Sequence, residues 1–233
     1  MNAPTLLLVA HGSVDPRATG AAQALVRQVS AARPDLAATV GFLDHAEPAP
    51  APALAVLPPG PVVVVPLLLA HAYHATDDIQ QVATDARRAG RRVAVAAVLG
   101  PDPLLLDAAE DLLQRAGVAA GTPVVLASAG TSSAPANAAT VGIAAELARR
   151  RGAAVVSAYA SAAEPTVRQA ISALGGRPAV LRWLLFPGRF ADAVSADAEA
   201  AGCTSTDVLA GSERLAELVL ARYDAAAEVA NGV

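Results

Sequence analysis

Short runs of consecutive apolar residues alternate along the chain with longer segments whose apolar residues recur at helical spacing. The runs are rich in valine and leucine and end in polar turns, which is typical of strands buried on both faces of a parallel sheet. Strands are predicted at residues 5–10, 39–43, 62–69 and 92–98. Helices are predicted from Asp15-Pro16 to Arg33-Pro34 and over residues 48–57, 76–89 and 103–117. Because strands alternate with helices, the pattern predicts an α/β fold with a doubly wound parallel sheet of the flavodoxin or Rossmann kind.

The second half of the chain repeats the first. Residues 6–13 match residues 124–131, the Ala-Glu-Pro at 46–48 recurs at 163–165, and residues 66–74 are loosely repeated at 182–190. The matching positions lie 116 to 118 residues apart, which indicates an internal duplication. We therefore predict two similar α/β domains, residues 1–120 and 121–233, with a cleft between them.

Composition narrows the class of protein. The hydrophobic content is 54% with a mean hydropathy of +0.43, but the longest strongly apolar stretch, residues 62–70, is interrupted by Pro66 and falls short of the ~20 residues of a membrane span. The N-terminal run has no preceding basic residues, so no secretory signal is predicted and we expect a cytoplasmic protein without membrane contact. The net charge of −4 without a basic block argues against nucleic-acid binding. A single cysteine, Cys203, excludes an internal disulfide.

Candidate chemistry is confined to the first half. All four histidines lie there, and Ala129 and Phe190 occupy the positions that match His11 and His74. Taken alone, His11 could be fixed by local hydrogen bonds, and Glu47 could be a carboxylate at the start of a helix. Together, two imidazoles and a carboxylate at the carboxyl ends of parallel strands would form an open site for a divalent metal such as Fe²⁺, Co²⁺, Ni²⁺ or Zn²⁺.

Three blocks, residues 8–17, 42–48 and 66–79, resemble in order and spacing the signature blocks of the sirohydrochlorin chelatases, the CbiX and SirB type of class II chelatase. The resemblance covers essentially the whole chain, with a degenerate second half. It implies a lyase that inserts Fe²⁺ or Co²⁺ into sirohydrochlorin, in siroheme or cobalamin biosynthesis, with Ni²⁺ or Zn²⁺ as further metals in vitro. His11, His74 and Glu47 would hold the metal and accept protons from the macrocycle. The metal would be a substrate, with no permanently bound cofactor. His71-Ala72 and Gln80 depart from the usual family residues and affect the expected shape of the turn.

Other residues are expected around this site. Sirohydrochlorin is a polycarboxylate, so arginines should orient it, and Ser13, Arg17, Tyr73 and Arg189 are the candidates for binding it. Arg17 could equally be a solvated residue of the first helical turn. His71 and His45 are secondary metal candidates, and solvation of an exposed turn is the simpler interpretation of His71.

Two other functions use the same residues. A non-catalytic carrier of Co²⁺ or Ni²⁺ could bind metal at His11, His74 and Glu47 and pass it to a partner. A phosphotransfer enzyme built on His11 is disfavoured, because Ala10 stands where such chemistry usually has an arginine. The duplication would supply both walls of the cleft within one chain, so a monomer is expected.

Overall fold

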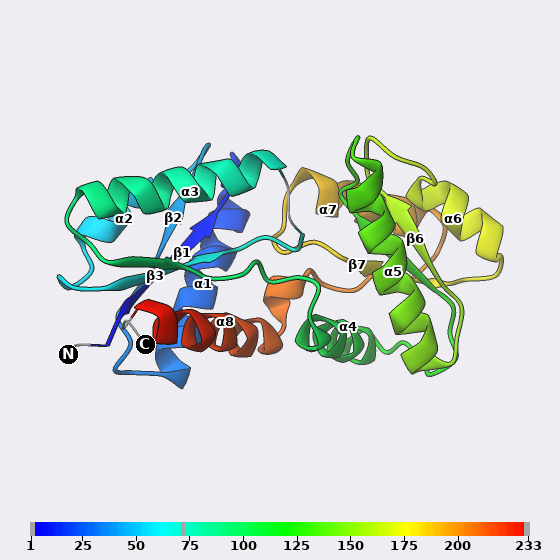
Figure 1. Ribbon diagram of the computed structural model, residues 1–233. Coiled ribbons are helices and arrows are strands. Elements are labelled where there is room, and N and C mark those ends of the chain that lie inside the picture. The colour runs from blue at the N-terminus through cyan, green and yellow to red at the C-terminus, as the bar shows by residue number, and fades with distance from the viewer. Residues whose placement is uncertain (1–2, 71–72, 231–233) are drawn as a thin grey trace. The chain divides into compact units, whose positions relative to one another are not determined.

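The computed structural model describes residues 3–70 and 73–230, with backbone alone at 73–76 and 229–230. The chain forms two compact units, one of residues 1–100 and 213–233 and the other of residues 101–212. Each contains one parallel sheet with helices on both faces, which confirms the predicted α/β class (Figure 1).

The first unit is built on a four-stranded parallel sheet in the order β2-β1-β3-β4. The strands are β1 (Thr5–Ala10), β2 (Ala38–Phe42), β3 (Val62–Pro66) and β4 (Val93–Val95). The central strand β1 is buried along its whole length, and it pairs with β2 and β3 on its two sides. Burial on both faces explains why its sequence is continuously apolar instead of alternating.

Helices cover both faces of this sheet. They are α1 (Pro16–Ala32), α2 (Pro50–Ala55), α3 (Tyr73–Arg88) and α8 (Arg214–Ala230). Helices α2 and α3 pack together over one face, on a core that includes Leu7, Val9 and Val64, whereas α1 and α8 pack together on the opposite face (Figure 1). Helix α1 begins as predicted, because the Asp15 carboxylate accepts a hydrogen bond from the Arg17 N–H and Pro16 follows the cap.

The second unit contains a three-stranded parallel sheet in the order β6-β5-β7. Its strands are β5 (Val124–Ser128), β6 (Val155–Tyr159) and β7 (Ala179–Arg182), and its helices are α4 (Pro103–Arg115), α5 (Ala134–Arg151), α6 (Val167–Leu174) and α7 (Arg189–Ala200), with a 3₁₀ turn at Leu209–Gly211. Helices α6 and α7 cover one face, over a core that contains Val125, Ala127 and Val180. Helix α5 packs on β6 and helix α4 on β7.

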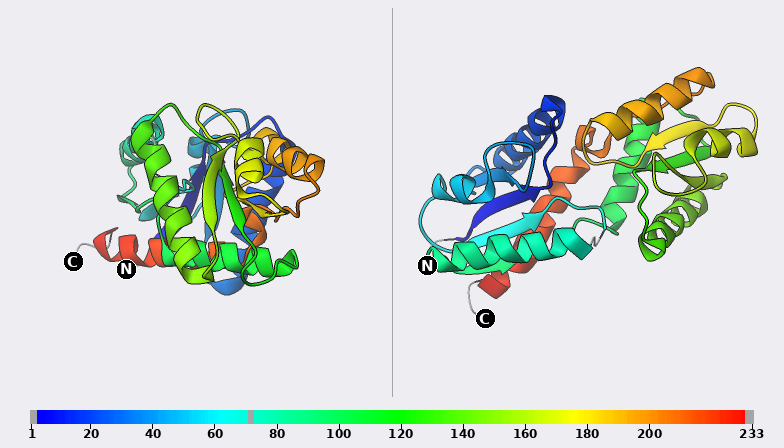
Figure 2. Two further views of the ribbon diagram at one scale, coloured as in Figure 1. Left: turned by 90° about the vertical axis from the view of Figure 1, so that its right-hand side faces the viewer. Right: turned by 90° about the horizontal axis from the view of Figure 1, so that it is seen from above.

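The last helix of each repeat belongs to the unit of the other repeat. Helix α4 follows the first three βα pairs in the chain but packs on β7, while α8 follows the second set and packs on β3 and α1 (Figures 1 and 2). The compact units therefore differ from the predicted domains, 1–120 and 121–233, by an exchange of equivalent helices. The division after residue 120 stays a prediction about the repeats.

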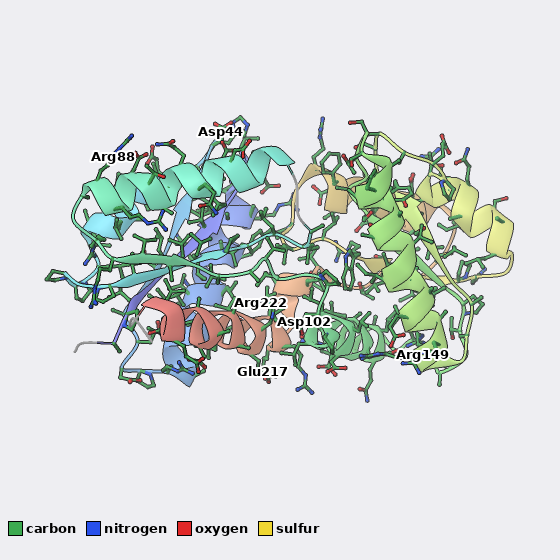
Figure 3. All side chains as sticks on the ribbon, viewed as in Figure 1. Asp44, Arg88, Asp102, Arg149, Glu217 and Arg222 are labelled. Carbon is green, nitrogen blue, oxygen red and sulfur yellow. The ribbon has the colours of Figure 1, made fainter. Side chains whose placement is uncertain are left out.

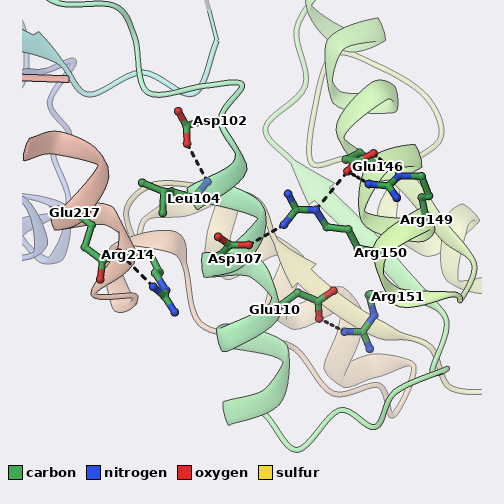
Figure 4. Close-up of polar contacts among 10 residues, drawn as sticks. All are labelled: Asp102, Leu104, Asp107, Glu110, Glu146, Arg149, Arg150, Arg151, Arg214 and Glu217. Carbon is green, nitrogen blue, oxygen red and sulfur yellow. Dashed lines mark hydrogen bonds and ion pairs between the residues drawn. The ribbon is translucent and has the colours of Figure 1, made fainter. Parts of the chain in front are cut away.

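Polar contacts secure both exchanged helices. In the second unit, Arg150 of α5 forms an ion pair with Asp107 of α4 at 2.7 Å, and Arg151 pairs with Glu110 of the same helix (Figure 4). In the first unit, the Tyr223 hydroxyl of α8 donates a 2.6 Å hydrogen bond to the Pro4 carbonyl. The partly exposed Arg150–Asp107 pair contributes only about 0.2 to 1 kcal/mol, and the attraction in the Arg151–Glu110 pair is offset by the desolvation of the buried Arg151 guanidinium. Apolar burial therefore carries most of the attachment.

Several predicted boundaries are corrected by the structure. Strand β3 ends at Pro66 and not at residue 69, because the Leu68 N–H turns back to the Pro66 carbonyl and the chain leaves the sheet. Helix α3 then begins at Tyr73, three residues before its predicted start, so His74 lies in the first helical turn and not at a strand end. Strand β4 and helix α2 are both shorter than predicted. Across the described residues, no helix combines the length and apolarity needed to cross a membrane.

Candidate metal site at the carboxyl edge of the first sheet

The turns that follow β1 and β2 are bonded to each other. The Leu43 N–H donates to the Ala10 carbonyl at 3.0 Å, and the Asp44 N–H donates to the His11 carbonyl at 2.8 Å. Gly12 sits between them with φ +97°, where a Cβ would lie 1.8 Å from the Asp44 carbonyl oxygen. Only glycine fits so close an approach with a positive φ, so the Gly12 turn brings the His11 backbone against residues 43–45.

His11 and His45 face each other across these turns. Their rings are 6.3 Å apart between centroids at an interplanar angle of 85°, and both residues are exposed. His45 has φ 58°, an unusual value for a residue with a side chain. The Asp44 carboxylate accepts the His45 backbone N–H at 2.8 Å, and its other oxygen lies 3.2 Å from the His45 Nε2. Asp44 lies at the surface of the first unit (Figure 3).

Glu47 is held at the start of α2. Its Oε2 accepts the Ala49 N–H at 3.0 Å, and Ala49 is the N-cap residue of that helix. Glu47 thus accepts a backbone N–H at the start of a helix, which is the role considered for it when it was taken alone. An ionised carboxylate has about four lone-pair sites, so a single N–H bond leaves capacity for a cation.

The third predicted ligand is outside the part of the chain whose side chains are described. The backbone places His74 and Tyr73 in the first turn of α3, and His71 falls in the undescribed residues 71–72. Among the described residues, no three side chains of histidine, cysteine, aspartate or glutamate gather as a metal cluster. The convergence of His11, Glu47 and His74 on one metal therefore stays a prediction.

The predicted substrate-binding residues that are described have local partners. The Ser13 hydroxyl accepts the Asp15 N–H at 3.1 Å. The Arg17 guanidinium pairs with the Asp15 carboxylate, and hydrogen bonds from Arg17 hold the pKa of Asp15 below its usual value. In the second unit, Arg189 begins α7 with its guanidinium 5.0 Å from the centroid of the Phe190 ring. A role of these side chains in holding a carboxylate substrate stays a prediction.

The second unit repeats the backbone of this site without its histidines. The Ser161 N–H donates to the Ala129 carbonyl at 2.9 Å, as Asp44 does to His11, and a Cβ on Gly130 would lie 2.0 Å from the Ser161 carbonyl oxygen. Ala162 has φ 56°, close to the value at His45. Glu164 accepts the Thr166 N–H at 3.3 Å, as Glu47 accepts that of Ala49. The duplicated turns therefore hold their shape whether or not they carry imidazoles.

A groove of about 920 Å³ adjoins the site in the first unit. It runs between α2 and α3, and His11 and Asp44 are among its lining residues. Asp78 and Asp85 of α3 add two exposed carboxylates to its wall. Its one arginine, Arg91, donates to backbone carbonyls of residues 54–60. This charge distribution favours a cation over a polycarboxylate.

Two parallel sheets, helices on both faces of each, and polar turns at the carboxyl edge together define a chelatase-like α/β protein. The sequence matches the CbiX family over residues 5–116 and again over 123–226, so the chain belongs to that family, the sirohydrochlorin chelatases, and the two matches correspond to the two repeats. The resemblance inferred from the three sequence blocks is confirmed.

Solved structures have the same fold. SirB from Bacillus subtilis with Fe³⁺ matches with a TM-score of 0.83 at 23% identity, covering 99% of this chain and 98% of that one. SirB from Bacillus subtilis subspecies spizizenii in complex with cobalt gives 0.79 at 21% identity, with 99% and 97% covered. CbiX, the terminal enzyme of siroheme biosynthesis in denitrifying bacteria, gives 0.68 at 21% identity, with 95% and 99% covered. No curated protein sequence matches the chain.

Proposed function

We propose that this chelatase inserts Fe²⁺ or Co²⁺ into sirohydrochlorin at the carboxyl edge of the first sheet. The observation that carries the proposal is the contrast between the two copies of one backbone: exposed His11 follows β1 in the first unit, and Ala129 holds its place in the second. The SirB structures with Fe³⁺ and with cobalt support a metal substrate of this kind.

Three residues of the first unit would share the chemistry. His11, Glu47 and His74 hold the incoming metal, which keeps open coordination positions because a closed cage would retain it. Insertion would join the metal to the macrocycle nitrogens and release two N–H protons, and each imidazole accepts a proton on the nitrogen that the departing metal has vacated. The Glu47 carboxylate stabilises the positive charge that this creates. Ser13, Arg17, Tyr73 and Arg189 orient the carboxylates of the macrocycle.

The decisive test is insertion in vitro. Apo-protein, sirohydrochlorin and Co²⁺ or Fe²⁺ are mixed, and the visible spectrum of the macrocycle is followed against buffer with the same metal. Acceleration that disappears in His11→Ala supports the enzyme. Metal binding without acceleration favours the alternative, a carrier of Co²⁺ or Ni²⁺. The competition between Fe²⁺ and Co²⁺ in the same assay decides which metal the protein prefers. We further expect a cytoplasmic monomer, which gel filtration with light scattering and cell fractionation would test.

A further inference from the structure

His45 stands on the turn after β2, and the centroid of its ring lies 6.3 Å from that of His11. The two residues are brought together by the backbone bond from the Asp44 N–H to the His11 carbonyl at 2.8 Å. The positive φ of 58° at His45 gives the turn its shape, and the ring stands edge-on to His11 at 85°. Both imidazoles are exposed to incoming solutes.

The distance between the rings suits a shared metal ion. Metal–nitrogen bonds to histidine are about 2.0 to 2.1 Å long, so two imidazoles on one ion have ring centroids roughly 4.5 to 6.4 Å apart as the N–metal–N angle opens from a right angle to a straight line. The observed 6.3 Å between His11 and His45 lies within that interval.

Histidines that bind metal commonly donate their other ring N–H to a carboxylate, and Asp44 is placed to accept it from His45. Its Oδ2 lies 3.2 Å from the His45 Nε2, so this nitrogen can donate its proton to the carboxylate while Nδ1 presents a lone pair. A carboxylate behind the imidazole fixes the ring and strengthens it as a ligand. The bond from the His45 backbone N–H to Asp44 Oδ1 holds the carboxylate in place.

The surroundings favour a cation that is bound weakly. Asp44, Asp78 and Asp85 line the adjoining groove, and their charge raises the local concentration of divalent ions. Among the described residues, no group of three or more histidine, cysteine, aspartate or glutamate side chains is arranged to hold a metal, so the two imidazoles would be the protein ligands and water would fill the remaining positions. Weak binding is what a substrate metal needs if it is to move on.

We infer that His45 and His11, with Asp44 behind His45, form a capture site for the incoming divalent metal. The inference rests on the proposed chelatase function for its purpose, because the captured ion passes from this pair to the macrocycle. The turn itself does not require these side chains. In the second unit the same backbone carries Ala129, Ser161 and Ala162 at the positions of His11, Asp44 and His45.

The first experiment measures metal affinity in the full chain without the macrocycle. Apo-protein is titrated with Co²⁺, followed by its visible absorption and by calorimetry. His45→Ala should raise the dissociation constant at least about tenfold, and Asp44→Asn about tenfold, as the loss of an outer carboxylate typically does. His45→Gly serves as a second variant, because glycine adopts the positive φ of this position at no cost. Unchanged affinity in folded His45→Ala and His45→Gly would overturn the inference.

A gain-of-site variant provides the matched control. Ala129→His, Ser161→Asp and Ala162→His together place the same three side chains on the duplicated turns, and the variant should bind one additional Co²⁺ per chain. A folded triple variant with unchanged stoichiometry would contradict the geometry that we assign to the pair. Both experiments are independent of insertion: if His45→Ala weakens Co²⁺ binding but the wild-type protein never metallates sirohydrochlorin, the capture site stands and the proposed function fails.

Discussion

Substitution of Glu47 by glutamine tests the division of labour between the two copies, because the chain contains its own control. Glu47 accepts the Ala49 N–H at 3.0 Å, and Glu164 accepts the Thr166 N–H at 3.3 Å in the equivalent turn. Glutamine keeps an acceptor oxygen and removes the charge. Each substitution should therefore cost at most about 0.3 to 1 kcal/mol of stability through the charge near the helix start, and the two costs should be similar.

Activity should separate the two variants. A charge-assisted contact contributes about 1.5 to 3 kcal/mol, which corresponds to about 10-fold to 160-fold in rate if it acts in the transition state. Glu47→Gln should lower kcat/KM for insertion by that factor, whereas Glu164→Gln should leave it within about twofold. Initial rates of the spectral change with sirohydrochlorin and Co²⁺ measure both. Equal losses in the two variants, at equal folded fraction by circular dichroism, would refute the assignment of one active copy.

Four further substitutions test individual contacts. His11→Ala should lower kcat/KM at least about 100-fold with an unchanged melting temperature, because the side chain is exposed; more than half the wild-type rate would contradict its role. Gly12→Ala and Gly130→Ala should each cost more than about 3 kcal/mol in urea unfolding, since the added Cβ meets backbone oxygen at 1.8 and 2.0 Å. Asp224→Asn should cost up to about 1 kcal/mol at pH 7, because hydrogen bonds from Arg33 lower the pKa of Asp224. This contribution is present above the unfolded value of 3.8 and is lost as the pH falls through the folded pKa, so the two proteins should become equally stable in acid, and a difference that persists there would exclude the ion pair as its source.

The two Asp-Pro signals predicted their helix starts well, whereas the ends of β3 and β4 were predicted too late. Asp15 and Asp102 cap α1 and α4 as their Asp-Pro pairs indicate, since this signal depends only on adjacent residues. The apolar run through residue 69 predicted too long a strand. Leu67 is buried and still donates to the Val9 carbonyl of β1, but the Leu68 N–H turns back to the Pro66 carbonyl. Hydrophobicity reports burial, and a buried apolar run does not show where strand pairing ends.

The metal site stays a prediction, and sequence patterns could indicate only some of its candidate residues. Strand ends and the duplication identified His11 and Glu47, because both features are visible as sequence patterns. The proximity of His45 to His11 depends on a positive φ at a residue that is not glycine, which no local pattern indicates. The contacts of Asp44 with His45, on which our inference depends, were not predicted from the sequence. An aspartate directly before a histidine was the available signal, and it becomes informative only when the turn is known to fold the two side chains together.

The exchange of α4 and α8 was outside the reach of sequence patterns, since the two helices are equivalent in the repeats and either could cover either sheet. It determines how the first unit can be isolated. Helix α8 buries Leu215, Leu218, Val219 and Tyr223 against the first unit. At about 1.5 to 3 kcal/mol for each large apolar side chain, this burial is comparable to the whole stability of a small domain, about 5 to 15 kcal/mol.

A fragment of residues 1–100 should therefore fail to fold, and a chain that joins residues 1–100 to 213–233 should fold. Arg222 donates to the Val98 and Leu99 carbonyls, and α8 begins eight residues earlier, about 12 Å along the helix, so a flexible Gly-Ser linker of modest length can connect the two parts. Thermal unfolding by circular dichroism distinguishes the fragment from the joined chain, and Co²⁺ titration of the joined chain then reports the metal site without the second unit. Cooperative unfolding of the 1–100 fragment at the temperature of the joined chain would show that α8 is dispensable. Residues 1–100 would in that case fold independently, and the exchange of helices would serve only to connect them to the second unit, which lacks the histidines.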